Sequence, residues 1–135
     1  MFQIEKALER GKCFIKDLPL SRVLLQDDCR FPWLILVPRV PSAQEIYHLT
    51  SDQQHVLMDE VSLVSKVLQD YVQADKINIA AFGNIVPQLH IHIIARFKMD
   101  EAWPHSVVGL KGSLPYSLAD RDKIVKDLSQ MIFFS

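Results

Sequence analysis

The stretch Gln88-Leu89-His90-Ile91-His92-Ile93-Ile94 alternates polar and apolar side chains. Successive side chains of a β-strand point to opposite faces of the sheet. The alternation therefore predicts a strand whose apolar face packs on helices, while Gln88, His90 and His92 share the other face. Side chains two positions apart on one face are separated by roughly 6.5–7 Å, so the two imidazoles could both contact one phosphate or one metal ion.

The segment that begins at Thr50 is predicted to be the longest helix. Thr50 and Gln53 fit a capping box, in which each side chain bonds the backbone N–H of the other residue. Apolar residues then recur every three or four positions, which places them on one face of a helix. This face comprises Leu57, Val61, Val64, Leu68 and Tyr71.

Shorter elements flank this helix on both sides. Residues 2–10 are predicted to form a short amphipathic helix that stops at Gly11, and Ser117 with Asp120 could cap a last helix. Short apolar runs separated by turn residues predict antiparallel strands. These runs are Val23–Leu25, Trp33–Val37, a run from Ile77, and the histidine strand after the Gly83-Asn84 turn. Together they predict an α+β fold: an antiparallel meander sheet with a central helix and flanking N- and C-terminal helices.

Composition limits the remaining classes of function. A chain of 135 residues corresponds to one domain, here residues 1–135. The net charge of −1 lacks the positive excess of a general nucleic-acid binder. The longest apolar stretch, residues 31–38, is far shorter than the ~20 residues of a membrane span. Two separated cysteines and the absence of a signal-peptide pattern favour a cytoplasmic location without nucleic-acid or membrane partners.

Two histidines on one strand can also be interpreted without a catalytic role. A His-x-His pair on a half-exposed strand is often no more than two surface histidines. As a metal site it supplies two ligands, whereas zinc takes three or four. The other histidines, His48, His55 and His105, have no ligand-like spacing. We therefore predict neither a metal nor another cofactor.

The segment QLHIHIIAR resembles the motif of the histidine triad (HIT) superfamily of nucleotide hydrolases and transferases, which reads His-φ-His-φ-His-φ-φ with φ apolar. The run PWLILVPR and the order helix, strand, glycine turn and histidine strand are similar to that family as well, and so is Trp103-Pro104. The resemblance covers about residues 20–105 and implies a HIT-like fold. The sequence departs from the motif at its first position, which is Gln88.

The resemblance implies a nucleotide hydrolase similar to diadenosine polyphosphate hydrolases. His90 would attack the α-phosphate of a dinucleoside polyphosphate or a nucleoside phosphoramidate and form a covalent nucleotidyl-histidine. One ring nitrogen of His90 must be free to attack, so we expect a backbone carbonyl to hold the other. His92 would contact the phosphate, with Asn84 and Gln88 as secondary contacts. Because transferases of the superfamily tend to carry glutamine where this chain has His92, hydrolysis is favoured.

Further site residues follow from the same resemblance. Gln26 and Asp27 would bind the nucleoside of a purine nucleotide, although a turn aspartate that bonds the backbone is an equal alternative for Asp27. Trp103 would line the entrance. Arg96 shares the histidine face, and we interpret it as a solvated strand-end arginine. The family resemblance also implies a homodimer. The alternative function is a catalytically weak nucleotide-binding or regulatory module, to which Gln88 points.

Overall fold

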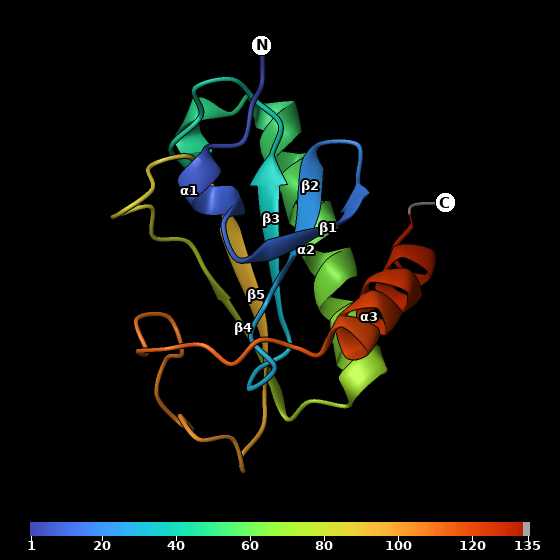
Figure 1. Ribbon diagram of the computed structural model, residues 1–135. Coiled ribbons are helices and arrows are strands. Elements are labelled where there is room, and N and C mark those ends of the chain that lie inside the picture. The colour runs from blue at the N-terminus through green and yellow to red at the C-terminus, as the bar shows by residue number, and fades with distance from the viewer. Residues whose placement is uncertain (134–135) are drawn as a thin grey trace.

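Five antiparallel strands form the central sheet of the computed structural model, which describes residues 1–133 (Figure 1). The order across the sheet is β1-β2-β3-β5-β4. The strands are β1 (Lys12–Asp17), β2 (Ser21–Gln26), β3 (Trp33–Pro38), β4 (Lys76–Ala80) and β5 (Ile91–Arg96). The predicted α+β class with an antiparallel sheet is therefore confirmed. The order of the strands across the sheet differs from their order along the chain in one respect: β5 lies between β3 and β4.

Two long helices cover one face of the sheet. Helix α2 (Ser51–Val72) begins with the predicted capping box: the Gln53 N–H donates to Thr50 Oγ1 at 3.1 Å, and the Thr50 N–H donates to Gln53 Oε1 at 2.9 Å. Helix α3 (Leu118–Met131) is capped by Ser117, whose hydroxyl accepts the Asp120 N–H as predicted. Within residues 1–133, no helix combines the length and the hydropathy that a bilayer crossing requires.

The main hydrophobic core lies between these helices and the sheet. Four of the five residues predicted for the apolar face of α2 are buried, while Tyr71 is partly buried. They meet the apolar side of β5, on which Ile91 and Ile93 are buried. The apolar half of the alternating pattern therefore packs on helices, as the sequence predicts.

The N-terminal segment and the loop after β5 cover the opposite face. Helix α1 (Lys6–Glu9) places Leu8 against Leu24 and Ile35, and Phe2 and Ile4 pack on the same cluster. The helix predicted for residues 2–10 is thus too long, because residues 1–5 are not helical. In Figure 1, α1 lies beside β3 on the near side of the sheet, while α2 lies behind the sheet.

Two further elements differ from the sequence prediction. Strand β1 was not predicted, and it pairs antiparallel with β2 at the sheet edge. The histidine strand begins at Ile91, so residues 85–90 reach it in irregular conformation after the Gly83 turn. A short 3₁₀ helix, η1 (Ile46–His48), precedes α2.

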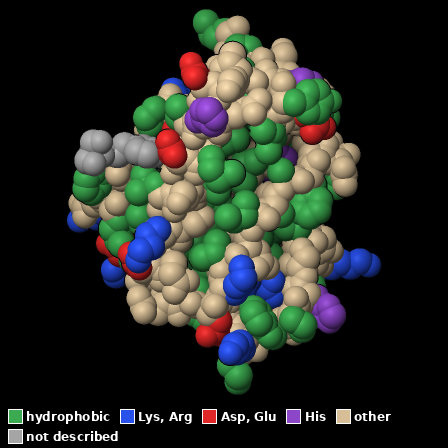
Figure 2. Space-filling view, turned by 180° about the vertical axis from the view of Figure 1, so that it is seen from behind, with side chains coloured by type: hydrophobic (Ala, Val, Ile, Leu, Met, Phe, Trp, Pro, Cys, Tyr) green, Lys and Arg blue, Asp and Glu red, His purple; other side chains and the backbone are tan. Residues whose placement is uncertain are grey.

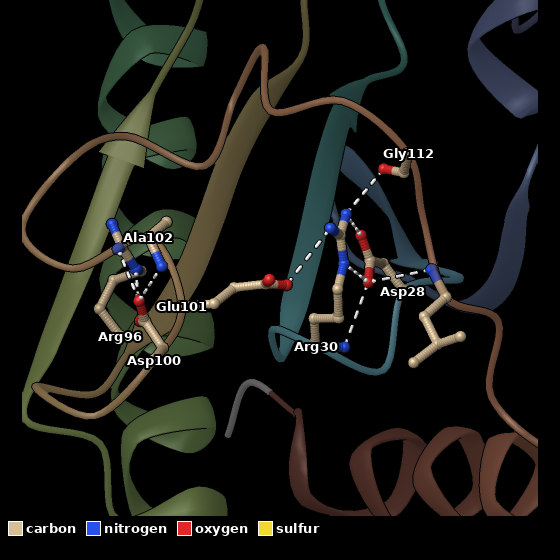
Figure 3. Close-up of polar contacts among 8 residues, drawn as sticks. Asp28, Arg30, Arg96, Asp100, Glu101, Ala102 and Gly112 are labelled. Atoms are coloured by element: carbon tan, nitrogen blue, oxygen red, sulfur yellow. Dashed lines mark hydrogen bonds and ion pairs between the residues drawn. The ribbon is translucent and has the colours of Figure 1, made fainter.

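Two ion-pair clusters anchor the loop between β5 and α3 (Figure 3). In one, the buried Asp28 carboxylate accepts bonds from Arg30, and the Arg30 guanidinium also donates to the Gly112 carbonyl at 2.7 Å. In the other, Arg96 pairs with Asp100 at 2.9 Å and donates to Asn78 Oδ1 at 2.8 Å. Arg96 is only 1% exposed, so its interpretation as a solvated arginine is wrong.

Candidate functional site

The imidazoles of His90 and His92 lie side by side on the sheet face that α1 partly covers. Their ring centroids are 5.0 Å apart in an edge-to-face arrangement, and each residue is 8% exposed. Both line a cleft of about 460 Å³. This volume is within the range of small-ligand sites. The walls come from α1, the start of β1, the loop after β4 and the loop at Val108 and Gly109.

The backbone fixes which nitrogen of His90 is available. His90 Nδ1 lies 2.7 Å from the carbonyl oxygen of Gln88. A carbonyl only accepts hydrogen bonds, so Nδ1 carries the hydrogen and Nε2 keeps its lone pair. The neutral imidazole therefore offers Nε2 as a nucleophile, with the other nitrogen held by a backbone carbonyl.

Trp33 fixes the opposite tautomer of His92. The indole Nε1–H donates to His92 Nδ1 at 3.1 Å, and the two rings are 5.7 Å apart. An indole N–H cannot accept, so Nδ1 is the acceptor and the hydrogen of neutral His92 is on Nε2. The adjacent imidazoles thus present one lone pair and one N–H, a complementary pair for attack on, and stabilisation of, a phosphoryl group.

His92 is uncharged at neutral pH. Burial lowers the pKa of its imidazole to about 4, with the charges of His90 and Lys12 acting in the same direction. The bond from Trp33 occupies the Nδ1 lone pair that a second proton would need. His92 therefore contributes a directed N–H donor and no positive charge.

The low pKa of His92 predicts a specific loss of stability in acid. Between about pH 6.5 and 4 the unfolded chain protonates this histidine and the folded chain does not, so the free energy of unfolding falls as the pH falls. The contribution approaches about 1.4 kcal/mol per pH unit in this range. His92→Gln should show a shallower decline than wild type in urea unfolding from pH 7 to about 5. Parallel declines in the two proteins would contradict the assignment.

Gln88, in the first position of the histidine motif, holds the N-terminal segment. Its Oε1 accepts the Glu5 N–H at 2.8 Å, and its Nε2 donates to the Gln3 carbonyl at 2.8 Å. These two bonds secure the segment that leads into α1, which forms one wall of the cleft. The backbone carbonyl of Gln88 also bonds the imidazole of His90. Gln88 therefore positions both a wall of the cleft and the His90 ring.

The loop after β4 brings Asn84 to the cleft, where it lies next to Gly83 among the lining residues. Gly83 has a φ of +72°, and a Cβ there would lie 3.4 Å from the Pro87 carbonyl oxygen. Glycine is therefore needed for the turn that sets this loop beside the histidines. Phe82 from the same loop lies 6.2 Å from the His92 ring, centroid to centroid.

Three other candidate residues do not line this cleft. Gln26, at the end of β2, pairs with Lys12 in the sheet and shares the face of Leu24 and His92. The carboxylate of Asp27 accepts the backbone N–H of Tyr116 at 2.9 Å. Trp103 packs on the buried guanidinium of Arg96, which is centred 5.7 Å from the indole ring.

Two residues of the site escaped the sequence analysis as functional groups. Trp33 is the first residue of an apolar strand, and its role depends on β3 and β5 being neighbours. Lys12 belongs to the unpredicted strand β1 and lines the cleft. The short run Cys13-Phe14-Ile15 after Gly11 is the signal that could have indicated this strand.

Residues 1–133 contain no cluster of three or more His, Cys, Asp or Glu side chains placed to hold an ion. His48 is engaged elsewhere, since its Nδ1 accepts the backbone N–H groups of Gln44 and Glu45.

This sheet and its paired histidines define the histidine triad class of α+β proteins. The HIT domain family model matches residues 8–99, and the chain belongs to this family, whose members are nucleotide-binding or hydrolase proteins. No curated protein sequence matches the chain.

Three solved structures of histidine triad proteins are similar to the whole fold. The protein from Bradyrhizobium japonicum has 44% identity and a TM-score of 0.95, with 98% of each chain covered. The protein from Sinorhizobium meliloti has 37% identity and a TM-score of 0.94, with 97% of each chain covered. The protein from Marinobacter aquaeolei has 38% identity and a TM-score of 0.93, with 98% of this chain and 99% of that chain covered.

Proposed function

We propose that this protein is a nucleotide hydrolase that cleaves at the α-phosphate through a covalent nucleotidyl-histidine on His90. The observation that carries the proposal is the tautomer pair in the cleft. His90 Nδ1 is held by the Gln88 carbonyl, which frees Nε2 for attack, and His92 offers an N–H beside it. The substrates are purine dinucleoside polyphosphates or nucleoside phosphoramidates.

The first step forms a bond between His90 Nε2 and the α-phosphorus. The bond from phosphorus to the leaving oxygen or nitrogen breaks, and the leaving group departs with its electron pair and takes up a proton. His90 Nδ1–H stays on the Gln88 carbonyl, which stabilises the positive ring. His92 Nε2–H and the Asn84 side chain donate to the non-bridging oxygens, where negative charge accumulates.

The second step returns the enzyme to its starting state. A water oxygen attacks the same phosphorus, the bond to His90 Nε2 breaks, and the water gives up a proton to solvent. The product is a nucleoside monophosphate. No metal ion is required by this sequence of bonds.

The remaining candidate residues have supporting roles in the proposal. Gln26 and Asp27 bind the nucleoside, Gln26 from the histidine-bearing face of β2 and Asp27 from the adjoining turn. Gln88 acts on the phosphate-binding end of the site through His90 and the N-terminal segment, which it positions. Trp103, in the loop after β5, lines the approach to the site. These roles rest on the family resemblance, since none of the four residues lines the cleft itself.

Phosphorus NMR tests the proposal directly. Diadenosine tetraphosphate and adenosine 5′-phosphoramidate are incubated separately with wild type and with His90→Asn. We expect wild type to release AMP from at least one of them, and His90→Asn to release none above background. Failure of wild type to turn over either substrate, with or without added divalent ions, would contradict the proposal.

One observation favours a second candidate function, a weakly catalytic nucleotide-binding or regulatory module. The Gln88 amide bonds the backbone of Gln3 and Glu5 through both its nitrogen and its oxygen, so the first position of the motif has a structural role. This alternative predicts that AMP raises the melting temperature while no substrate is hydrolysed. His90-dependent turnover would exclude it.

We further propose that the protein forms a homodimer through the β4 edge. Among residues 1–133, no strand pairs with the outer side of β4, which is an edge strand of the sheet. Ile79 of β4 is 54% exposed and Met58 of α2 is 66% exposed, and both border one apolar groove. Figure 2, which views the molecule from behind, shows hydrophobic side chains gathered over the middle of that face. An open strand edge beside apolar surface favours pairing with a second copy.

Light scattering after size exclusion tests the dimer. We expect twice the chain mass for wild type and a monomer for Ile79→Asp, because a charge on the paired edge would be buried without a partner. Leu118→Asp, which changes an even more exposed apolar side chain at the start of α3, should remain dimeric. A monomeric wild type, or a dimeric Ile79→Asp, would exclude this interface.

A further inference from the structure

Of the residues that the structure describes, 1–133, Lys12 is the single charged side chain that lines the histidine cleft. The two histidines and Asn84 supply the polar groups there, and the other lining residues are apolar or glycine. The ammonium group of Lys12 is therefore the one formal positive charge that the cleft lining offers to a bound phosphate. The position of Lys12 decides where a second anionic group of the substrate can be held.

We propose that Lys12 binds a second phosphate group of the substrate, distinct from the phosphate that His90 attacks. The inference rests on the proposed function, because it takes the His90 side of the cleft as the site of the α-phosphate. It narrows the substrate class to nucleotides with at least two phosphate groups. A phosphoramidate of a nucleoside monophosphate, with an uncharged or cationic amine, offers no such group.

The sheet places Lys12 on the same face as the histidines. Lys12 and Phe14 point to the same side of β1, and the row of cross-strand neighbours from Phe14 runs through Leu24 and Ile35 to His92. Lys12 also borders an adjoining groove of about 570 Å³. It therefore lies where two hollows on the histidine face meet, so a ligand that extends beyond the α-phosphate passes it.

The ammonium group of Lys12 has bonding capacity left for a ligand. Its Nζ donates to the Arg10 carbonyl at 3.3 Å, and an ammonium has three hydrogens to donate. Among residues 1–133, no carboxylate lies within ion-pair distance of it, whereas Arg22, Arg30 and Arg96 each have such a partner. The adjoining groove also holds Glu9 and the mutually paired Asp17 and Arg22, so Lys12 is its unpaired cation.

Partial burial makes this charge effective. Burial lowers the pKa of Lys12, which shows that the ammonium is partly desolvated. An unpaired cation in such surroundings is costly, and an anionic ligand relieves the cost. Attraction between charges is also stronger where the effective dielectric is lower than in water.

The second phosphate can come from either of two parts of a nucleotide. It can be the next phosphate of the leaving chain, or a phosphate on the ribose of the bound nucleoside. Three non-hydrolysed ligands separate these sources: AMP, its α,β-methylene diphosphate analogue, and adenosine 3′,5′-bisphosphate. AMP gives the reference affinity of a ligand with one phosphate.

Isothermal titration calorimetry compares wild type, Lys12→Gln and Lys98→Gln with each ligand. Lys98 is exposed and follows the far end of β5, so it controls for the change in net charge. We expect wild type to bind one of the two-phosphate ligands about ten-fold more tightly than AMP, which is about 1.4 kcal/mol. Lys12→Gln should reduce that ratio below about two-fold, while Lys98→Gln and Lys12→Arg should keep it. Preference for the methylene analogue assigns the leaving chain, and preference for the bisphosphate assigns the ribose.

An equal affinity of wild type for all three ligands would overturn the role of Lys12. A preference that persists in Lys12→Gln would do the same. Hydrolysis is measured separately, so the two proposals fail in different ways. If wild type hydrolyses the substrate but Lys12→Gln leaves the ratio of affinities unchanged, only the Lys12 proposal fails. If the ratio depends on Lys12 but nothing is hydrolysed, only the hydrolase proposal fails. Absence of binding by all three ligands contradicts both.

Discussion

His90→Asn should lower the turnover of the best substrate by about four orders of magnitude or more. The asparagine amide can still donate to the Gln88 carbonyl that now holds His90 Nδ1, so the local backbone keeps its bond. It has no lone pair of imidazole character to offer the phosphorus, which removes covalent catalysis. The initial rate of AMP release, followed by chromatography at saturating substrate, measures the loss.

His55→Asn is the matched control for this variant. His55 lies on the exposed side of α2, and its replacement changes the same functional group outside the cleft. We expect its turnover to stay within about two-fold of wild type. If His90→Asn retained a tenth of the wild-type rate, His90 would not be the nucleophile.

Asp100→Ala should lower the free energy of unfolding by about 3–5 kcal/mol. Arg96 is 1% exposed and Asp100 is 6% exposed, so the variant leaves a buried guanidinium without its carboxylate. The Asp100 side chain also accepts the backbone N–H of Ala102 at 3.1 Å (Figure 3). It accepts the Phe97 N–H at 3.1 Å as well, and these two bonds fold the start of the loop. Urea unfolding, read by far-ultraviolet circular dichroism, measures the change.

Asp70→Ala provides the comparison for this variant. Its carboxylate pairs with Lys66 on the surface of α2, where both side chains are more than half exposed. An exposed pair of this kind contributes at most about 1 kcal/mol. If the two variants lost equal stability, the Arg96–Asp100 pair would not be the anchor of this loop.

The Arg96–Asp100 pair also links stability to the site. The loop that it anchors continues to Val108 and Gly109, which line the cleft. We therefore infer that the Arg96–Asp100 pair, although it lies outside the cleft, positions one of the cleft walls.

Elements with local signals could be predicted from the sequence. The Thr50 and Ser117 caps bond groups three residues away, so the residues that make each bond are visible together in the chain. The shared face of His90 and His92 follows from the two-residue alternation of side chains, which holds although β5 itself begins at Ile91; the two ring centroids lie 5.0 Å apart. These predictions needed no knowledge of the tertiary structure.

Elements that depend on distant partners could not be predicted in this way. Strand β1 has a short apolar run between lysines, and it becomes a strand because β2 pairs with it. Residues 1–5 are not helical: Phe2 and Ile4 pack on a sheet cluster, and Gln88 bonds the backbone of Gln3 and Glu5. Neither cause is visible within the N-terminal segment itself.

The same reason limits the prediction of the site. The bond from Trp33 to His92 joins residues 59 positions apart, and it sets a tautomer that no local pattern encodes. Lys12 reaches the cleft only through the pairing of β1 with β2. The histidine pair was therefore predictable from the sequence. Trp33, which sets the tautomer of His92, and Lys12, which brings a positive charge to the cleft, were not.

The stereochemical course at the α-phosphorus tests the covalent mechanism most directly. A substrate with a chiral α-phosphorothioate is hydrolysed in isotopically labelled water, and the configuration of the product is determined. Each in-line displacement inverts the phosphorus, so attack by His90 followed by attack of water should give net retention. Net inversion would show that water attacks the substrate directly, and it would contradict the nucleotidyl-histidine.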